Sequence, residues 1–242
     1  MDLLVQFLLR LTFGLAFGMA ITSPRQVTSG YFRNHLYVTL GFATLAALVA
    51  MNSLTTVAVL SAGAAVLSYV GSVCWLYEAK RAGVALLWLV AATALAGAVV
   101  GEGGGPLQLA SVVTSGLVLG LTFAAMLLGH WYLNAPGMEL APLQRLLKFM
   151  AAAVAAQMVV SALGLVGIEQ AASQPVVGWW LFVVLRWSFG LLGVLGLIWM
   201  AWETLKIPNT QSATGILYVA VIGVFVGELT GLLLSAQSDS PL

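Results

Sequence analysis

Charged side chains are scarce in this sequence of 242 residues. Nine Lys and Arg and eight Asp and Glu make up 7% of the chain, whereas soluble globular domains carry about 25%. Hydrophobic residues make up 61%, and the mean hydropathy is +1.04. So few charges cannot cover the surface of a water-soluble protein, so we expect lipid to be the solvent. A net charge of +1 also excludes a nucleic-acid binder that works through a basic patch.

Cysteine and histidine are almost absent, since Cys74 is the one cysteine and His35 and His130 are the two histidines. A single cysteine excludes an internal disulfide framework and a Cys-rich zinc or iron–sulfur site. Two histidines exclude a haem arrangement that needs four from this chain. We find no catalytic constellation and no metal site, because the carboxylates stand singly and no Ser, His and Asp share one side of the membrane.

Long apolar runs dominate the chain, and a helix needs about 20 apolar residues to cross the hydrocarbon layer. Eight runs are separated by polar residues, Pro or Gly, and the weakest separator is Met51-Asn52-Ser53. The sequence therefore predicts an all-α integral membrane protein, a single polytopic domain over 1–242 with a bundle of about eight transmembrane helices. These helices are expected near residues 3–21, 36–51, 54–76, 82–100, 107–130, 146–167, 178–202 and 212–235.

Cationic residues fall on one side of this arrangement. The odd-numbered predicted loops hold Arg25, Arg33, Lys80, Arg81, Arg145, Lys148 and Lys206. Because Lys and Arg are retained in the cytoplasm, we expect these loops to be cytoplasmic and both termini extracytoplasmic. The membrane we expect is a bacterial cytoplasmic membrane.

A weak internal similarity links the two ends of the chain. The sequence LRLTFGL at 9–15 resembles LRWSFGL at 185–191, and LYV recurs at 36–38 and 217–219. One interpretation is a parallel repeat that relates predicted helices 1–2 to helices 7–8. The other is chance matching in a biased composition.

Three charged residues lie inside predicted helices: Arg10, Arg186 and Glu228. Each is roughly 10–12 Å from the extracytoplasmic end of its helix at 1.5 Å per residue. Charges in hydrocarbon usually face the bundle interior and find partners, so we expect the three to converge, with the first helix beside the last two. Polar residues expected near the same level are Thr44, Ser61, Thr93, Thr114, Ser115 and Ser161, with Gln157 slightly deeper.

Two interpretations of the charged cluster remain open. In the first, Glu228 bridges the arginines, or one arginine extends to lipid phosphates, and the cluster is structural. In the second, two arginines against one glutamate leave one positive charge, which an anionic group would neutralise.

The two histidines stand at the predicted cytoplasmic interface, His35 before the second helix and His130 at the end of the fifth. Their neighbours in sequence are Tyr31, Arg33, Trp131 and Tyr132. These residues either form an interfacial belt or contact a haem or a quinone, and a proton relay is a third interpretation.

We expect a non-catalytic membrane subunit of a larger, energy-transducing or electron-transfer complex, which packs against other membrane subunits and contacts haem or quinone. The alternative is a small secondary transporter for an anionic or proton-coupled solute. A lipid-handling enzyme would use the arginines on a phosphate, but the sequence offers no nucleophile or metal site. The expected partners are the lipid bilayer and other membrane subunits, not nucleic acid.

The loop charges generate a topology prediction. Single cysteines placed at Lys80 and at Glu102, in a chain whose Cys74 is replaced by serine, should react with an impermeant thiol reagent from opposite sides of the membrane. The measurement is labelling of intact cells against labelling of inverted vesicles. Reaction of both positions from the same side would contradict the predicted topology.

Overall fold

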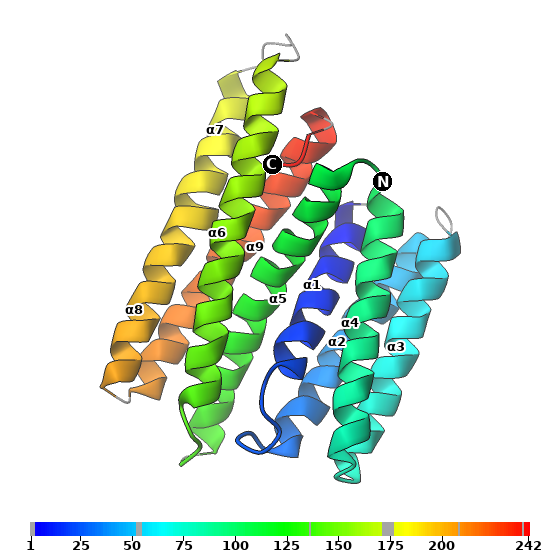
Figure 1. The fold of residues 1–242 in the computed structure, drawn as a ribbon, viewed down its shortest axis with the longest axis vertical. Helices are drawn as coiled ribbons and strands as arrows, with labels where there is room; N and C mark the ends of the chain where they lie inside the picture. The colour runs from blue at the N-terminus through cyan, green and yellow to red at the C-terminus, as the bar shows by residue number, and fades with distance from the viewer. Residues whose placement is uncertain (1–2, 52–54, 136, 171–176, 208, 239) are drawn as a thin grey trace.

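The computed structural model of the protein describes residues 3–51, 55–135, 137–170, 177–207, 209–238 and 240–242. Within these residues the chain is helical and contains no strand (Figure 1). The helices are α1 (Leu3–Ala20), α2 (Ser29–Ala50), α3 (Thr55–Leu76), α4 (Lys80–Glu102), α5 (Pro106–Asn134), α6 (Ala141–Gln170), α7 (Val177–Leu185), the π-helix η1 (Arg186–Gly193), α8 (Val194–Lys206) and α9 (Thr210–Ser238).

Seven of these stretches are long and apolar enough to cross a bilayer, with α7, η1 and α8 counted as one. They support an integral, polytopic membrane protein, as the apolar runs predict. The other long helix, α2, is not among the seven. It begins at Ser29, seven residues before the predicted run at 36–51, so its first turns include Arg33 and His35. The count of eight transmembrane helices and the internal repeat stay predictions.

The outer surface of the helices is apolar. Large hydrophobic side chains that are exposed on it include Leu48, Val59, Val66, Phe182, Trp199 and Ile222. A surface this apolar would be unfavourable in water. It is consistent with direct contact between these helices and the lipid bilayer.

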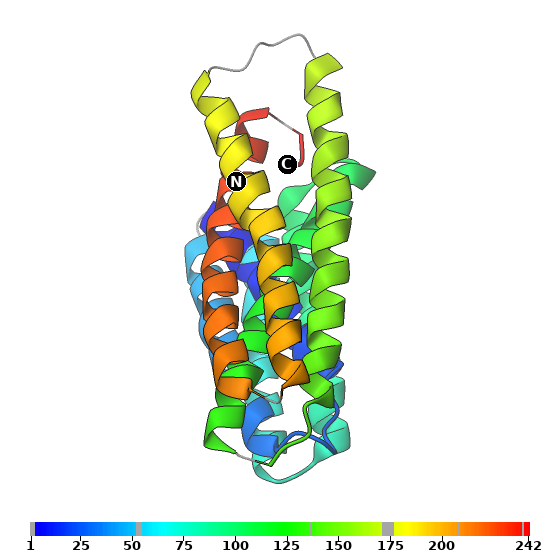
Figure 2. The same cartoon turned by 90° about the vertical axis from the view of Figure 1, so that its left-hand side faces the viewer.

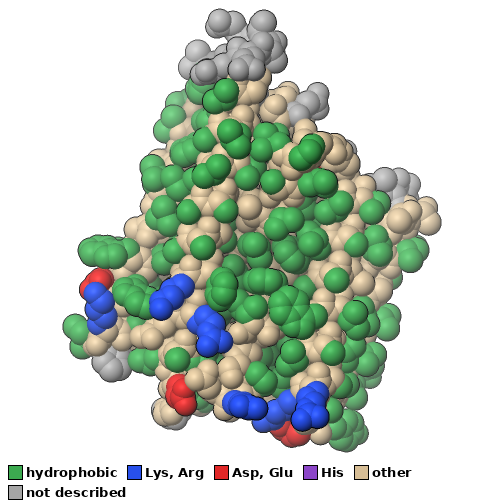
Figure 3. Space-filling model, viewed as in Figure 1, with side chains coloured by type: hydrophobic (Ala, Val, Ile, Leu, Met, Phe, Trp, Pro, Cys, Tyr) green, Lys and Arg blue, Asp and Glu red, His purple; other side chains and the backbone are tan. Residues whose placement is uncertain are grey.

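The two ends of the molecule differ in charge. Figure 1 shows both termini at the upper end and the connections after α1, α3, α5 and α8 at the lower end. On the face in Figure 3, Lys and Arg side chains lie in the lower half. We call the lower end the basic end and the other the terminal end. The helices thus bring the odd-numbered predicted loops together, while the side of the membrane that each end faces stays a prediction.

Helix α5 lies between two groups of helices. It packs against α1 on one side and against α6 and α9 on the other, while α1 also packs against α4 and α2. Figure 2 shows α6 and α7 diverging at the terminal end, with the end of α9 and the last residues of the chain between them. The carbonyl of Pro241 meets the backbone of α6 at Gly164 there, since a Cβ on Gly164 would lie 1.8 Å from it.

The boundaries of two predicted elements change. The predicted loop from Trp131 to Gln144 is much shorter, because α5 continues to Asn134 and α6 begins at Ala141. His130, Trp131 and Tyr132 therefore belong to the last turns of α5. The run at 178–202 extends to Lys206, and its middle is π-helical at Arg186–Gly193. Such segments are rare, and they are frequent at functional sites.

Helices α1 and α5 are in backbone contact at three glycines. A Cβ on Gly14 would lie 1.8 Å from the carbonyl oxygen of Gly116, and one on Gly120 would lie 1.9 Å from the carbonyl carbon of Gly14. Small residues allow this approach in membranes, where packing drives helix association. The contact sets the position of α1, and with it the position of Arg10, relative to α5.

Replacing Gly120 by alanine should destabilise the fold by at least about 1–3 kcal/mol, because the new methyl group meets backbone that no rotamer change can move. The matched control is Gly41→Ala on α2, where a Cβ meets nothing within 4 Å; it should leave stability unchanged or slightly improved. Unfolding of the purified protein by SDS measures both. Equal stability of the two variants would show that α1 and α5 do not make this contact.

Candidate functional site

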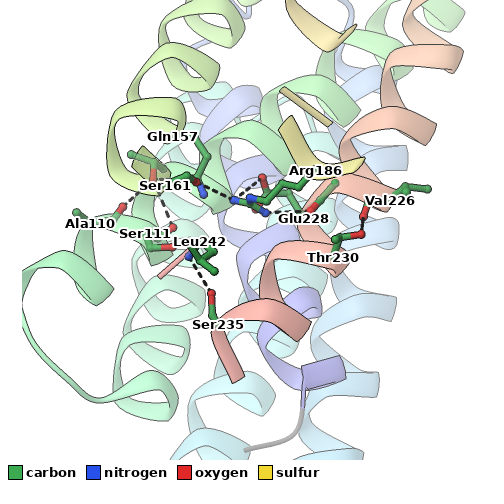
Figure 4. Close-up of polar contacts among 12 residues, drawn as sticks. Ala110, Ser111, Gln157, Ser161, Arg186, Val226, Glu228, Thr230, Ser235 and Leu242 are labelled. Atoms are coloured by element: carbon green, nitrogen blue, oxygen red, sulfur yellow. Dashed lines mark hydrogen bonds and ion pairs between the residues drawn. The ribbon is translucent and has the colours of Figure 1, made fainter. Parts of the chain in front are cut away.

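Arg186 begins the π-helix η1 and is buried, with 1% of its surface exposed. Its side chain reaches across α9 (Figure 4). Nη1 donates to the carbonyl of Gly227 at 2.9 Å, and Nη2 donates to the hydroxyl of Ser161 on α6 at 3.3 Å. Nη2 also lies 3.6 Å from a carboxylate oxygen of Glu228, which is equally buried. The structure thus brings Arg186 and Glu228 together as an ion pair in the apolar interior.

Glycines on both helices make this reach possible. A Cβ on Gly231 would lie 1.6 Å from Nη1 of Arg186, so any side chain there would occupy the place of the guanidinium. A Cβ on Gly190 would lie 2.5 Å from the Cα of Gly227, which shows that η1 and α9 touch through their backbones. The small residues of α9 therefore allow a long cationic side chain to cross it.

Two further polar side chains, on α5 and α6, are hydrogen-bonded to each other near Ser161. The hydroxyl of Thr114 donates to the amide oxygen of Gln157, and Gln157 lies one turn before Ser161 on α6. Gln157 is fully buried. We call Thr114, Gln157, Ser161, Arg186 and Glu228 the interior polar cluster.

Two donors of this cluster have no acceptor in the part of the chain that the structure describes. They are Nε of Arg186 and Nε2 of Gln157. Nearly all buried polar atoms in proteins are hydrogen-bonded, and a buried donor without a partner costs about 1–3 kcal/mol. Two such donors in one cluster indicate that the cluster has capacity for a ligand that accepts hydrogen bonds.

Arg10 has a different partner from the one that the sequence predicts. Its Nη2 lies 2.9 Å from a carboxylate oxygen of Glu102, and its Nε donates to the side-chain oxygen of Gln6 at 3.2 Å. Helix α1 packs closely on α4, and α4 extends to Glu102, which lies beyond the predicted helix at 82–100. A carboxylate at the C-terminus of a helix is unfavourable without a cation, so Arg10 stabilises the end of α4.

Glu102 changes the charge of the layer. The two buried ion pairs, Arg10 with Glu102 and Arg186 with Glu228, together comprise two cations and two anions, and we call these four groups the charged layer. The excess positive charge that the sequence suggests is therefore compensated by Glu102. Contact between α1 and α9 includes the rings of Phe7 and Phe225, whose centroids are 5.2 Å apart.

A polar cleft opens at the terminal end and descends toward this layer. It has a volume of about 390 Å³, and its lining includes Gln6, Glu102, Gln108, Leu232, Ser235 and Ser240. Gln6 and Glu102 are the residues that hold Arg10. Leu232 and Ser235 follow Glu228 by one and two turns on the same face of α9. The cleft therefore reaches Glu102 of the first ion pair, and on α9 its lining comes within one turn of Glu228, at Leu232.

Other polar residues predicted at this level lie apart from the cluster. The hydroxyls of Ser61 and Thr93 donate to carbonyls of their own helices, and Thr44 lines an apolar surface groove between α2 and α3. Ser115 is buried without a partner in the described part of the chain. The predicted polar layer is thus confined to α5, α6, η1 and α9, with Arg10 and Glu102 beside it.

The residues predicted to contact a cofactor only partly come together at the basic end. His35 is buried, and its ring lies 4.5 Å from the ring of Tyr31 and 6.1 Å from that of Trp131. Its Nδ1 lies 2.6 Å from the Tyr31 carbonyl, so this nitrogen donates. His130 is exposed and lies beside Tyr218 of α9 instead. Arg33 is partly exposed, and the hydroxyl of Tyr132 donates to the carbonyl of Glu139.

This end of the molecule offers a packed aromatic group around His35, with His130 turned to a different neighbour. No three His, Cys, Asp or Glu side chains among the described residues are placed to hold a metal ion. The structure therefore gives the two histidines different neighbouring residues. An interfacial belt or a single contact to a planar ring are both compatible with it.

The buried pair generates a stability prediction. Glu228→Leu alone should destabilise the protein by about 3–5 kcal/mol, because it leaves the Arg186 charge buried without a partner. The double variant Glu228→Leu, Arg186→Met should be less destabilised than the single one. The same cycle on the exposed pair Lys206 and Glu203 is the control and should give about 0–1 kcal/mol. Unfolding by SDS measures each variant, and additive effects at the buried pair would refute the coupling.

Comparison with protein-family models, with characterised proteins and with solved structures finds no match to the chain. Its function is therefore inferred from the arrangement of its own residues.

Proposed function

We propose that the protein is a small secondary transporter whose solute binds at the interior polar cluster. The observation that carries this proposal is the pair of buried donors without acceptors, Nε of Arg186 and Nε2 of Gln157. A cluster that serves only to hold helices together is expected to satisfy its own hydrogen bonds. A cluster that binds and releases a polar solute must have donors that the solute completes.

The surroundings of the cluster support this role. The polar cleft exposes Glu102 at the terminal end, and Leu232 in its lining lies one turn after Glu228 on α9. The π-helix η1 carries Arg186 at the point where α7 meets α8, so a change in this segment would move the guanidinium. Helices α6 and α7 diverge at the same end (Figure 2). These features support a solute site at the cluster.

Transport by purified protein in liposomes tests the proposal. The assay follows uptake of radiolabelled acetate, lactate, succinate, phosphate or neutral amino acids into the liposomes. We expect at least one solute to enter at a rate that depends on the protein. Gln157→Leu removes one unpaired donor and should reduce the rate at least tenfold, whereas Thr93→Val, which removes a hydroxyl bonded only within α4, should retain it.

Both variants should unfold in SDS like the unmodified protein, so that a lost rate reports the cluster and not the fold. Transport by the Gln157→Leu protein at the normal rate would overturn the proposal. Failure of the unmodified protein to move any solute of the panel would also overturn it.

A second candidate function is the membrane-complex subunit that the sequence suggests. The observation that favours it is an apolar groove of about 480 Å³ on the outer face of α2 and α3, lined in part by the small side chains of Ala47 and Ala62. Small residues suit close packing of another helix. If this function is correct, purification in mild detergent should recover a stoichiometric membrane partner, and Ala62→Leu should release that partner. A contact to haem near His35 should give a Soret band in the absorption spectrum of the purified complex.

A further inference from the structure

We propose that the interior polar cluster takes one small monovalent anion together with one proton, and that Glu228 carries the proton. This inference rests on the proposed function, because it names the class of solute and the coupling at the same cluster.

The free donors determine the kind of ligand. Nε of Arg186 and Nε2 of Gln157 are both N–H groups, so their partner must present acceptor atoms. Figure 4 shows Gln157, Ser161 and Arg186 gathered between α6 and α9. A carboxylate or a similar planar oxyanion presents two oxygens side by side, which suits a guanidinium edge and a neighbouring amide.

The charges of the layer determine the stoichiometry. Arg10 and Arg186 oppose Glu102 and Glu228, so the layer is neutral when all four are ionised. A monovalent anion that enters alone would leave one negative charge in the hydrocarbon interior, where isolated charges are costly. One proton taken up with the anion restores neutrality, whereas a divalent anion would need two.

Glu228 is the group best placed to take this proton. Its carboxylate is the partner of Arg186, so protonation of Glu228 frees the guanidinium to bind the anion directly. Its charged neighbour is Arg186 on η1, and Arg10 on α1 is paired with Glu102 on α4. The backbone oxygen of Leu242 also lies beside the Arg186 guanidinium, since a Cβ on Gly231 would be 1.6 Å from Nη1 and 2.8 Å from that oxygen. The described residues of the cluster on α5 and α6 are neutral. Glu102 is also paired, but its partner Arg10 donates to Gln6 and not to the cluster.

The entry that we propose for the proton is the cleft, at the face of α9 that carries Glu228. The cleft holds Leu232 and Ser235, which follow Glu228 on one face of the helix, and two turns of helix span roughly 11 Å. A proton that arrives from water in the cleft adds to a carboxylate oxygen of Glu228, and the ion pair with Arg186 ends. Release of the anion lets Arg186 pair with Glu228 again, and the proton leaves.

The experiment measures binding of lactate, acetate and nitrate to the purified protein by calorimetry, with succinate as the divalent comparison. For a monovalent anion that binds, we expect Kd to fall about tenfold for each unit by which the pH is lowered, since one proton enters with it. Calorimetry in buffers of different ionisation enthalpy should give one proton taken up per anion in the unmodified protein. This readout needs no variant.

Glu228→Gln imitates the protonated carboxyl, so it should bind the anion with a Kd that does not depend on pH. In liposomes it should exchange labelled anion across the membrane but no longer accumulate it against a gradient when protons drive uptake. Glu203→Gln, at the basic end and bonded only to Lys206, is the control and should behave like the unmodified protein.

Anion binding without proton uptake, or an unchanged pH dependence in Glu228→Gln, would overturn this inference. If only a neutral solute binds, and Gln157→Leu abolishes its binding, the proposed transport function is retained and the proposed uptake of one anion with one proton is rejected. If no solute binds or is transported, both proposals are rejected.

Discussion

The structure depends on keeping charged side chains paired where there is no water to solvate them. Arg186 meets this constraint by crossing α9 to Glu228, and Arg10 meets it by reaching the end of α4 at Glu102. Each solution requires its helices to approach closely, at Gly190, Gly227 and Gly231 in one case and at the α1–α4 contact in the other. In this fold, the pairing of the buried charges therefore depends on the close contacts between the helices.

Buried polar side chains occur in both groups of helices. Between α2 and α3, Thr39 donates to Ser68, and Ser68 donates to a carbonyl of its own helix, while the indole N–H of Trp75 on α3 has no partner among the described residues. Around α6, η1 and α9, Nε of Arg186 and Nε2 of Gln157 both lack acceptors among those residues, and the helix is π-helical where Arg186 begins. Two such donors in one polar cluster, beside a buried ion pair, distinguish the second group from the first.

The neutrality of the layer shapes what it can do. The two arginines are paired with two glutamates, so these four side chains carry no net charge together. They therefore do not attract an anion through a net positive charge. In the transport function that we propose, selectivity then comes from the free donors and from a change in protonation. This condition differs from the unpaired positive charge that the sequence suggests, and in our proposal it links solute binding to proton binding through Glu228.

The sequence alone determined the solvent, the apolar helices and their alternation between two ends, because hydropathy and loop charge are local properties that a run of residues carries by itself. It also singled out Arg10, Arg186 and Glu228 as charges in need of partners. Only the tertiary structure decided that Arg10 pairs with Glu102, that α2 includes His35, and that Gln157 and Arg186 retain free donors in one place. The pairing of helices depends on glycine contacts between segments that are distant in sequence, as the contact of Gly14 with Gly120 shows. The hydrophobic pattern within one helix does not specify which other helix packs against it.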